Sequence, residues 1–409
     1  MENVKQLNEC LCCGSKNLSL TLDLGEQPMA NSFIKTEDAD ELVFPLKLNR
    51  CRECDHLQLS HAVNPDLLFR DYLYVSGTSK TLKDYFDRFA SWATSNLFFD
   101  NKPTTVLDIA CNDGTQLDSF KTAGFNTYGI DPAINLHALS SVNHAVVCDY
   151  FKQEHVEHYK NLKIDVINAQ NVFAHNDYPL EFLKQCKEIM HDESVLFIQT
   201  SQADMVKNNQ FDTIYHEHLS FFNANSMKEL AHRAGLPLIH ISKTEIHGTS
   251  YVFAFSKTRV PDNTVEDTLA EEQLAGLHSP ATYIAYAKKC QQVTADLKEA
   301  LIGYKAGGYV LAGYGAAAKG MTLLNYGNIQ LDFVIDDNPL KQGLFTPGTH
   351  IPVVSIDMLK ECEDLNVVFV PLAWNFYTEI RNRILQVRNK EGDVFVRYFP
   401  TISIDRNVE

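Results

Sequence analysis

Two Cys-x-x-Cys pairs near the start of the chain constrain its fold more than any other feature. Cys10 and Cys13 form the first pair, and Cys51 and Cys54 form the second. Each pair can direct two thiolates at one ion from a tight turn, and four thiolates complete a tetrahedral zinc site with Zn–S bonds of about 2.3 Å. Because four thiolates leave no position for water, we expect a structural zinc ion.

The remaining cysteines favour the same interpretation. Of ten cysteines in the chain, five lie in the first 54 residues and the others are scattered singly. In a reducing compartment such a cluster is typical of metal binding rather than of disulfides. Cys12 is the spare thiol, and it can in principle replace Cys13 as a ligand. The plain alternative is a set of buried or free cysteines.

Beyond this segment, short apolar runs alternate with stretches of helical period, which predicts an α/β fold with a largely parallel sheet. Residues 258–279 are polar and acidic, so we expect a linker there, followed by a helix at 281–301. A second α/β unit then begins. The expected domains are 1–70 (zinc-binding), 71–277 (α/β) and 278–409 (a second α/β unit). The expected strands are 104–110, 126–131, 144–149, 165–170 and 194–200, then 308–315, 331–338, 352–356 and 366–372.

Charge and hydropathy exclude several classes of protein. The chain has 52 acidic and 36 basic residues, with a formal net charge of -16. This acidic balance offers no basic stripe for a nucleic-acid backbone. No run approaches the roughly 20 apolar residues of a membrane span, and the first residues lack a basic segment followed by an apolar one. We therefore expect a cytoplasmic protein, a monomer, with neither nucleic acid nor a membrane as partner.

A tight turn follows the first strand of the expected central sheet. Asn112, Asp113 and Gly114 form this turn, at the carboxyl end of the strand, where open parallel sheets bind their ligands. The next strand ends at Asp131, whose carboxylate can accept hydrogen bonds from both ribose hydroxyls of an adenosine. A nicotinamide dinucleotide would require a Gly-x-Gly-x-x-Gly turn instead.

The acidic character of this turn favours a cationic cofactor. Asp108 and Asp113 would repel a pyrophosphate, but they suit the sulfonium and ammonium of S-adenosylmethionine. Asp149, after the third strand, is placed to meet the adenine amino group, and Asn171, after the fourth, to lie near the methionine end. An acidic loop without a ligand is the plain alternative. The candidate cofactor residues are Asp108, Ala110, Asn112, Asp113, Gly114, Asp131, Asp149 and Asn171.

Two histidine-bearing segments lie where the active face of the sheet is expected. His175 follows the fourth strand, and the run Tyr215, His216, Glu217, His218 comes after the fifth. An imidazole has a pKa near neutrality and can remove a proton from carbon. If the run is extended, His216 and His218 point in opposite directions, and only one faces the substrate. A second metal is the alternative, but the run lacks the His-Glu-x-x-His spacing of zinc hydrolases.

A glycine-rich turn opens the last α/β unit. Gly313, Gly315 and Gly320 can let the backbone approach a diphosphate, and Lys319 adds positive charge. Asp336 and Asn338 end the next strand and are candidates for contacts to ribose or base. The alternative is an ordinary tight turn in a structural domain.

The chain resembles, over nearly its entire length, the bacterial sugar C-methyltransferases that act on nucleotide-linked keto sugars. The stretches that carry the resemblance are CLCCG, LGEQPMANSF, CREC, YLYVSGTS, VLDIACNDGTQL, NVFAH, YHEHLSFF, LAGYGAAAKGMTLLNY, PGTHIP and LAWNF. The resemblance implies a zinc-binding N-terminal domain, a central S-adenosylmethionine domain and a C-terminal Rossmann-like domain that helps to hold the sugar nucleotide.

The same resemblance assigns roles to individual residues. It places the catalytic base at His218, with Tyr215 and Glu217 beside it, His175 nearby and Tyr74 as the active-site tyrosine. It also implies methyl transfer to C-3, beside a C-4 ketone, on a sugar linked to dTDP or GDP. The chain departs from the family at residues 247–253, where relatives carry a second glycine and a basic residue, which puts substrate contacts in doubt.

Three other functions remain open from the sequence. An NAD(P)-dependent sugar-nucleotide oxidoreductase would use the glycine-rich turn of the last unit but leave the turn at Asn112 and the histidines idle. A non-catalytic zinc-bearing scaffold would leave the histidine run without a role. An O- or N-methyltransferase acting on a sugar nucleotide is the third. It is distinguished from a C-methyltransferase by whether the hydrogen on the carbon beside the ketone exchanges with deuterated water in the absence of cofactor.

Overall fold

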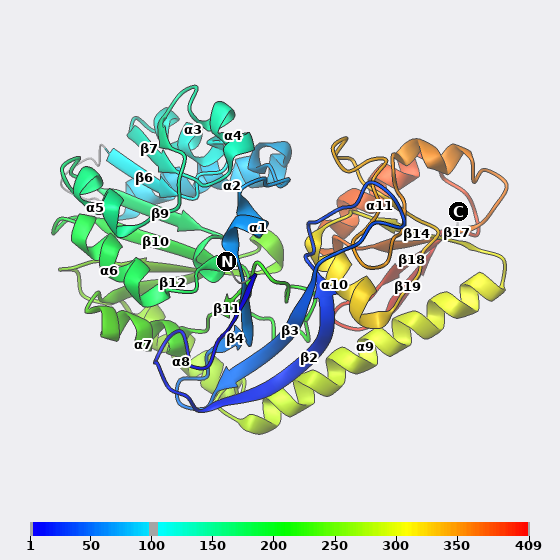
Figure 1. Cartoon of the computed structure of the whole chain (residues 1–409), viewed down its shortest axis with the longest axis horizontal. Helices are drawn as coiled ribbons and strands as arrows, with labels where there is room; N and C mark the ends of the chain where they lie inside the picture. The colour runs from blue at the N-terminus through cyan, green and yellow to red at the C-terminus, as the bar shows by residue number, and fades with distance from the viewer. Residues whose placement is uncertain (1–2, 98–104, 408–409) are drawn as a thin grey trace.

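Four sheets organise the chain in the computed structural model, which describes residues 3–97 and 105–407. Thr104, the predicted start of the first central strand, lies outside the described residues. Two small N-terminal sheets, a seven-stranded central sheet and a six-stranded C-terminal sheet follow one another along the chain (Figure 1). The predicted α/β class, with two Rossmann-like units after an N-terminal zinc-binding domain, is confirmed.

The N-terminal domain is built on a long antiparallel hairpin. Its two strands pair from Leu18 opposite Cys51 to Pro28 opposite Val43. The order of the larger sheet is β11-β4-β3-β2, so a strand from the middle of the sequence completes it. The elements are β1 Val4–Gln6, β2 Leu18–Pro28, β3 Val43–Cys51, β4 Leu57–Leu59, β5 His61–Val63, α1 Pro65–Phe69 and β11 Ser220–Phe221.

The central sheet has the order β12-β13-β10-β9-β6-β7-β8. Strands β6 to β10 run parallel, and β13 is antiparallel to both of its neighbours. The first strand thus lies in the middle, between β9 and β7, where strand order reverses and ligands bind at the carboxyl ends. The strands are β6 Thr105–Ile109, β7 Asn126–Ile130, β8 Ala145–Val147, β9 Val166–Gln170, β10 Val195–Thr200, β12 Leu238–Thr244 and β13 Ser250–Phe255.

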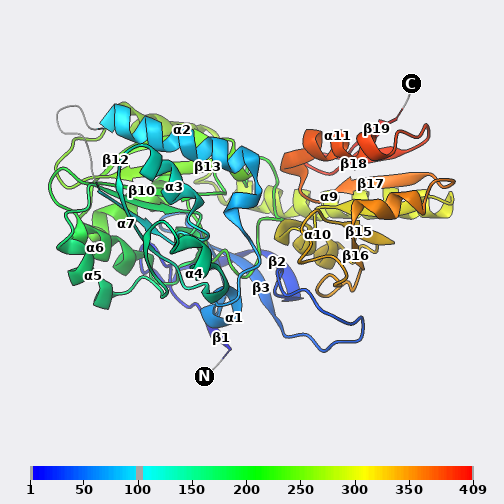
Figure 2. The same ribbon diagram turned by 90° about the horizontal axis from the view of Figure 1, so that it is seen from above.

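Helices cover both faces of this sheet, as Figures 1 and 2 show. Every residue of β6, β9 and β10 is buried, which explains why these strands are apolar runs rather than alternating patterns. The helices are α2 Lys80–Leu97, α3 Thr115–Thr122, α4 Ile134–Ser140, α5 Gln153–Lys160, α6 Pro179–Ile189 and α7 Ala224–Ala234.

The acidic segment predicted as a linker is largely helical, so that prediction was wrong. Helix α8 (Asn263–Leu274) packs on the central domain and buries Val265 and Glu272. The Glu272 carboxylate accepts the backbone N–H of Ala224 at 2.8 Å, at the first residue of α7. The buried stripe of α8 is narrow, and the many exposed acidic residues of this helix hid its helical period in the sequence.

The C-terminal domain begins with a long helix, α9 (Pro280–Ala306), which spans from the central domain to the last sheet (Figure 1). That sheet has the order β16-β15-β14-β17-β18-β19, parallel except for β19. Its elements are β14 Val310–Tyr314, α10 Ala318–Gly327, β15 Phe333–Ile335, β16 Val353–Val354, β17 Val367–Pro371, α11 Tyr377–Val387, β18 Val394–Arg397 and β19 Ser403–Arg406. Among the described helices, none combines the length and apolar character needed to cross a bilayer.

Candidate active site

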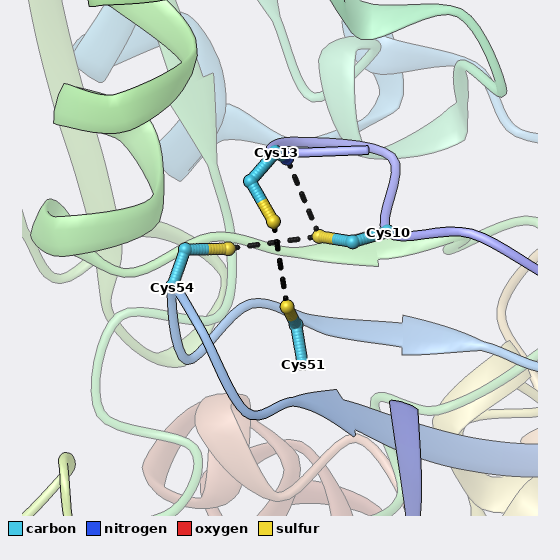
Figure 3. Close-up of side chains that lie close together, drawn as sticks. All are labelled: Cys10, Cys13, Cys51 and Cys54. Carbon is cyan, nitrogen blue, oxygen red and sulfur yellow. Dashed lines mark hydrogen bonds between the residues drawn. The ribbon is translucent and has the colours of Figure 1, made fainter. Parts of the chain in front are cut away.

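The four predicted zinc ligands meet at one point between the two cysteine turns (Figure 3). The Sγ atoms of Cys10 and Cys54 lie 3.6 Å apart, and those of Cys13 and Cys51 lie 3.5 Å apart. A tetrahedral zinc ion with Zn–S bonds of about 2.3 Å separates its sulfur ligands by about 3.8 Å. The donor set therefore fits zinc. Cys12 is buried but lies outside this group.

The backbone explains why these turns hold their thiolates together. In the first turn, Gly14 donates its N–H to the carbonyl of Cys10, and in the second Asp55 donates to that of Cys51. Both residues have positive φ, at 77° and 60° respectively. Left-handed backbone at these positions closes each turn so that both of its sulfur atoms face the same ion.

A cavity of about 500 Å³ opens at the carboxyl ends of β6, β7 and β9. It has the size and position of a ligand site in an open parallel sheet. One half is lined by the polar turn after β6, and the other by the histidine segments, so the expected cofactor and catalytic residues share one continuous space.

Six of the eight candidate cofactor residues line this cavity. Asp113 and Gly114 do not. The Asp113 carboxylate instead accepts the backbone N–H groups of Gly77 at 2.8 Å and Thr115 at 3.2 Å, and Gly114 starts α3 with a φ of 86°. These two residues shape the turn rather than face a ligand. The six that line the cavity are Asp108, Ala110, Asn112, Asp131, Asp149 and Asn171.

Buried carboxylates give the cofactor half its electrostatic character. Asp131 accepts the backbone N–H of Asn112 and of Ala133, each at 2.8 Å, which fixes the carboxylate at the end of β7. Asp108 accepts from the Asn168 amide at 2.6 Å, and burial raises its pKa to about 7. Buried acids of this kind are stabilised by a cationic ligand.

Polar atoms without partners also mark this half. Gln116 Nε2, Gln170 Oε1 and Asn171 Oδ1 are buried, line the cavity and have no hydrogen-bond partner among the described residues. Buried polar groups normally find partners, so a ligand with both donors and acceptors is indicated. S-adenosylmethionine carries the adenine, ribose and amino-acid groups that such atoms bind, and the residues present fit it.

The catalytic half is centred on His218. Its Nδ1 lies 2.8 Å from the carbonyl oxygen of Thr213, and its Nε2 lies 2.9 Å from the hydroxyl of Tyr215. A carbonyl only accepts, so Nδ1 carries the proton, and the Gln202 amide 3.1 Å from Nδ1 presents its oxygen to it. The Nε2 lone pair accepts from Tyr215. Burial lowers the pKa of His218 well below its usual range, so the ring is neutral at pH 7.

Other predicted catalytic residues surround this imidazole. His175 and Tyr74 line the same cavity, and the His175 ring centroid lies 5.1 Å from that of His218. Burial lowers the pKa of His175 to about 4. The segment 215–219 is a turn, not an extended strand, and the ring of His216 lies against the carbonyl of Phe44, outside the cavity. Only His218 of the two faces the site.

Glu217 lies behind the cavity rather than on its wall. Its carboxylate accepts from the Tyr72 hydroxyl at 2.9 Å and from the Asn31 amide at 2.5 Å. Tyr72 does line the cavity, and sequence reasoning missed it. The repeated tyrosine of YLYVSGTS, with Tyr74 already chosen, was the available signal. Asn31, from the stretch LGEQPMANSF, joins the N-terminal domain to this network.

The four candidate substrate residues of the C-terminal domain do not all face the cavity. Lys319, in the first turn of α10, lines the cavity, whereas Gly315, Asp336 and Asn338 do not. The Asp336 carboxylate accepts the backbone N–H of Ala316 at 2.7 Å and that of Asn338 at 2.8 Å, which closes the turn after β14. Their contacts to a nucleotide remain predictions.

Three family models match the chain in succession. They are described as "Putative zinc binding domain" over residues 10–69, "Methyltransferase domain" over 77–241 and "C-methyltransferase C-terminal domain" over 245–400. The three matches follow the order of the cysteine cluster, the central sheet and the C-terminal sheet, and the third begins at residue 245, ahead of β13 of the central sheet. These matches identify an S-adenosylmethionine-dependent C-methyltransferase.

One relative that aligns over nearly the whole chain agrees with this assignment. The C-methyltransferase is 29% identical to C-methyltransferase NovU of Streptomyces niveus over 390 residues, or 92% of each chain. Ubiquinone biosynthesis O-methyltransferase of Glaesserella parasuis serovar 5 is 31% identical over 108 residues, 23% of this chain and 44% of that one. The solved plantazolicin methyltransferase BamL covers 43% of this chain and 84% of its own, with 14% identity and a TM-score of 0.34, a likeness that carries no argument.

Proposed function

We propose that this C-methyltransferase adds a methyl group to C-3 of a nucleotide-linked 4-keto deoxysugar, with dTDP or GDP as the nucleotide. The observation that carries the proposal is a neutral His218 that lines the cavity together with the cofactor residues, with the Tyr215 hydroxyl on its Nε2 lone pair. A base for carbon is needed only where the acceptor C–H must ionise. The C–H beside a ketone is acidic enough for an imidazole to act on it.

The protein's part in the reaction is proton removal and alignment. His218 takes the proton from C-3 at Nε2, directly or through the Tyr215 hydroxyl that occupies this lone pair in the free protein. Tyr74, Tyr215 and His175 are neutral donors that can hydrogen-bond the ketone oxygen. Asp108, Asp131 and Asn171 would hold S-adenosylmethionine in the other half of the cavity, and this cofactor supplies a methyl group on a sulfonium leaving group. Alignment of two reactants can contribute roughly 7–11 kcal/mol.

The further details of the proposal follow from the same residues. We assign zinc binding to residues 1–70, cofactor binding and chemistry to 71–277, and support of the sugar nucleotide to 278–409. A cytoplasmic location fits ten cysteines that are all free in the structure, and we also propose a monomer. Asp149 would meet the adenine amino group.

Replacement of the base tests the proposal. His218→Gln should abolish methyl transfer to dTDP-4-keto-6-deoxyglucose or GDP-4-keto-6-deoxymannose, because the amide cannot take the proton. Binding of S-adenosylhomocysteine, measured by calorimetry, should stay within about threefold, because His218 lies in the other half of the cavity. His232→Gln, at an exposed position of α7, is the matched control and should leave both measurements unchanged. Turnover that survives in His218→Gln would place the base elsewhere.

A further inference from the structure

The C-terminal domain places one positive charge beside the catalytic histidine. Lys319 is the only residue after position 277 among those that line the cavity. The other cation of the lining, Lys152, donates to Asp149 at 3.1 Å in the cofactor half. Among the described lining residues, Lys319 is therefore the single cation of the catalytic half.

Contacts from two loops hold the Lys319 ammonium in place. Nζ donates to the carbonyl oxygen of His247 at 2.9 Å and lies 5.0 Å from the ring centroid of Trp374. His247 itself lines the cavity and has a left-handed backbone, with a φ of 58°. One of the three N–H donors of Lys319 is thus used by His247, and the ammonium has further donors for a group in the cavity.

The buried carboxylate of Asp212 favours the charged form of Lys319. Asp212 has no exposed surface, and its Oδ2 accepts from Trp374 Nε1 at 2.7 Å. Its Oδ1 has no hydrogen-bond partner in the described part of the chain. Burial lowers the pKa of Lys319 and the charge of Asp212 raises it. Because the pKa of Asp212 is itself about 6, raised by burial, the carboxylate is charged at neutral pH and favours the ammonium form.

The tyrosines and the other histidines of the catalytic half are neutral. A phenol is neutral at pH 7, and burial raises the pKa of Tyr215 well above its usual range. Burial lowers the pKa of His175 and of His247 to about 4. None of these groups carries a positive charge at pH 7. A charge that develops on a substrate oxygen beside His218 has Lys319 as its available counter-ion.

We propose that Lys319 is a catalytic residue that donates to the ketone oxygen and stabilises the enolate, rather than a contact to the diphosphate. This inference rests on the proposed function. The C–H bond next to the ketone breaks, the proton goes to His218 Nε2, and the electron pair forms the C=C bond while the carbonyl oxygen becomes negative. Lys319 meets that charge by a charge-assisted hydrogen bond, which is about twice as strong as a neutral one. Asp212 and Trp374 position it.

Exchange of the substrate hydrogen in D2O without cofactor tests this role, because enolisation then occurs alone. The full chain is incubated with dTDP-4-keto-6-deoxyglucose or GDP-4-keto-6-deoxymannose, and deuterium uptake is followed by mass spectrometry. Lys319→Met should lower both the exchange rate and the kcat of methyl transfer by about 10²- to 10³-fold, as loss of one oxyanion donor does. KM should stay within about threefold, and Lys319→Arg should recover part of kcat.

Several outcomes overturn the inference, and they are distinguishable from a failure of the proposed function. A raised KM with unchanged kcat in Lys319→Met would indicate a diphosphate contact. A kcat within threefold of wild type would exclude any catalytic role. Lys305→Met, which removes an exposed ion pair with Asp332, is the control for loss of a lysine in the same domain. If Lys319→Met does not fold, as judged by its melting curve, Lys319→Gln decides by the same criteria, and Lys319→Arg should again exceed it in kcat. If the wild-type protein neither exchanges nor methylates either sugar, the proposed function fails, and this inference with it.

Discussion

At the scale of single residues, burial sets the chemistry of this site. A histidine at its ordinary pKa is partly protonated at neutral pH, and only its neutral fraction can act as a base. Removal from water disfavours the charged form, and His218 is therefore neutral. The Thr213 carbonyl then selects the tautomer, because it holds the proton on Nδ1.

This environment predicts an unusual pH dependence. A lowered pKa means that the imidazole loses its proton at a lower pH, so His218 is an available base throughout neutral and weakly acidic solution. We expect kcat for methyl transfer at saturating S-adenosylmethionine to stay flat from pH 8 to about 6 and to fall only below that. Asp108, whose pKa is about 7, titrates first but lies in the cofactor half, and Asp212, whose pKa is about 6, titrates next. Initial rates across pH 5 to 8 provide the measurement.

Binding of S-adenosylhomocysteine over the same pH range is the control for a loss of structure in acid. An acid limb with a midpoint near 6.5 would contradict the prediction, since it would show that His218 titrates like a histidine in water.

At the scale of elements, the zinc turns fasten the base of the β2–β3 hairpin. The first turn precedes β2 and the second follows β3, and Leu18 pairs with Cys51 at this end. The opposite end of the hairpin reaches α10, the helix that carries Lys319. The ion therefore stabilises the domain around it and lies apart from the reacting atoms.

Zinc content distinguishes the two candidates for the second ligand. Cys13→Ala should lower the zinc content well below one ion per chain and lower Tm, because three thiolates do not close the site. Cys12→Ala should retain the ion, although it removes a buried side chain. Atomic absorption and thermal unfolding measure the two effects. Equal zinc loss in both variants would show that Cys12 takes part in the site.

Strands and motifs were predicted well from the sequence because their signals are local. The apolar runs gave β6, β9 and β10, and the paired cysteines gave the metal site. Contacts between segments that are distant in the sequence were harder to predict. Tyr72 faces the cavity because Glu217 and Asn31 lie behind it. The Asp113 carboxylate accepts from the backbone of Gly77, which is far from it in sequence, and so does not face the cavity. Helix α8 was missed because its buried stripe is narrow.

At the scale of the whole molecule, the catalytic half of the cavity depends on how the last two domains dock. Trp374 of the C-terminal domain donates to Asp212 of the central domain at 2.7 Å. A Cβ at Gly248 would lie 2.9 Å from the same indole, so the glycine permits this close approach. The two loops that flank His218 and His247 are thus held by a neighbouring domain.

Loosening this contact should impair chemistry more than cofactor binding. Trp374→Ala should lower kcat by about 10- to 100-fold, since small misplacements of reacting groups are costly. It should also lower the free energy of unfolding by about 1–3 kcal/mol. Affinity for S-adenosylhomocysteine, measured by calorimetry, should remain within threefold. Trp374→Phe keeps a ring but removes the N–H, so it separates the hydrogen bond from the packing. A parallel loss of cofactor affinity would contradict this division.

The position of Lys319 has a consequence for how such proteins can change. Under the proposed function, in which the C-terminal domain supports the sugar nucleotide, a chimera that exchanges this domain between relatives would also replace the lysine at the start of α10 and the indole that holds it. A chimera can then gain a new specificity and stay active only if the incoming domain carries the counterparts of Lys319 and Trp374. Recombination among these proteins should succeed only where the donor domain brings both.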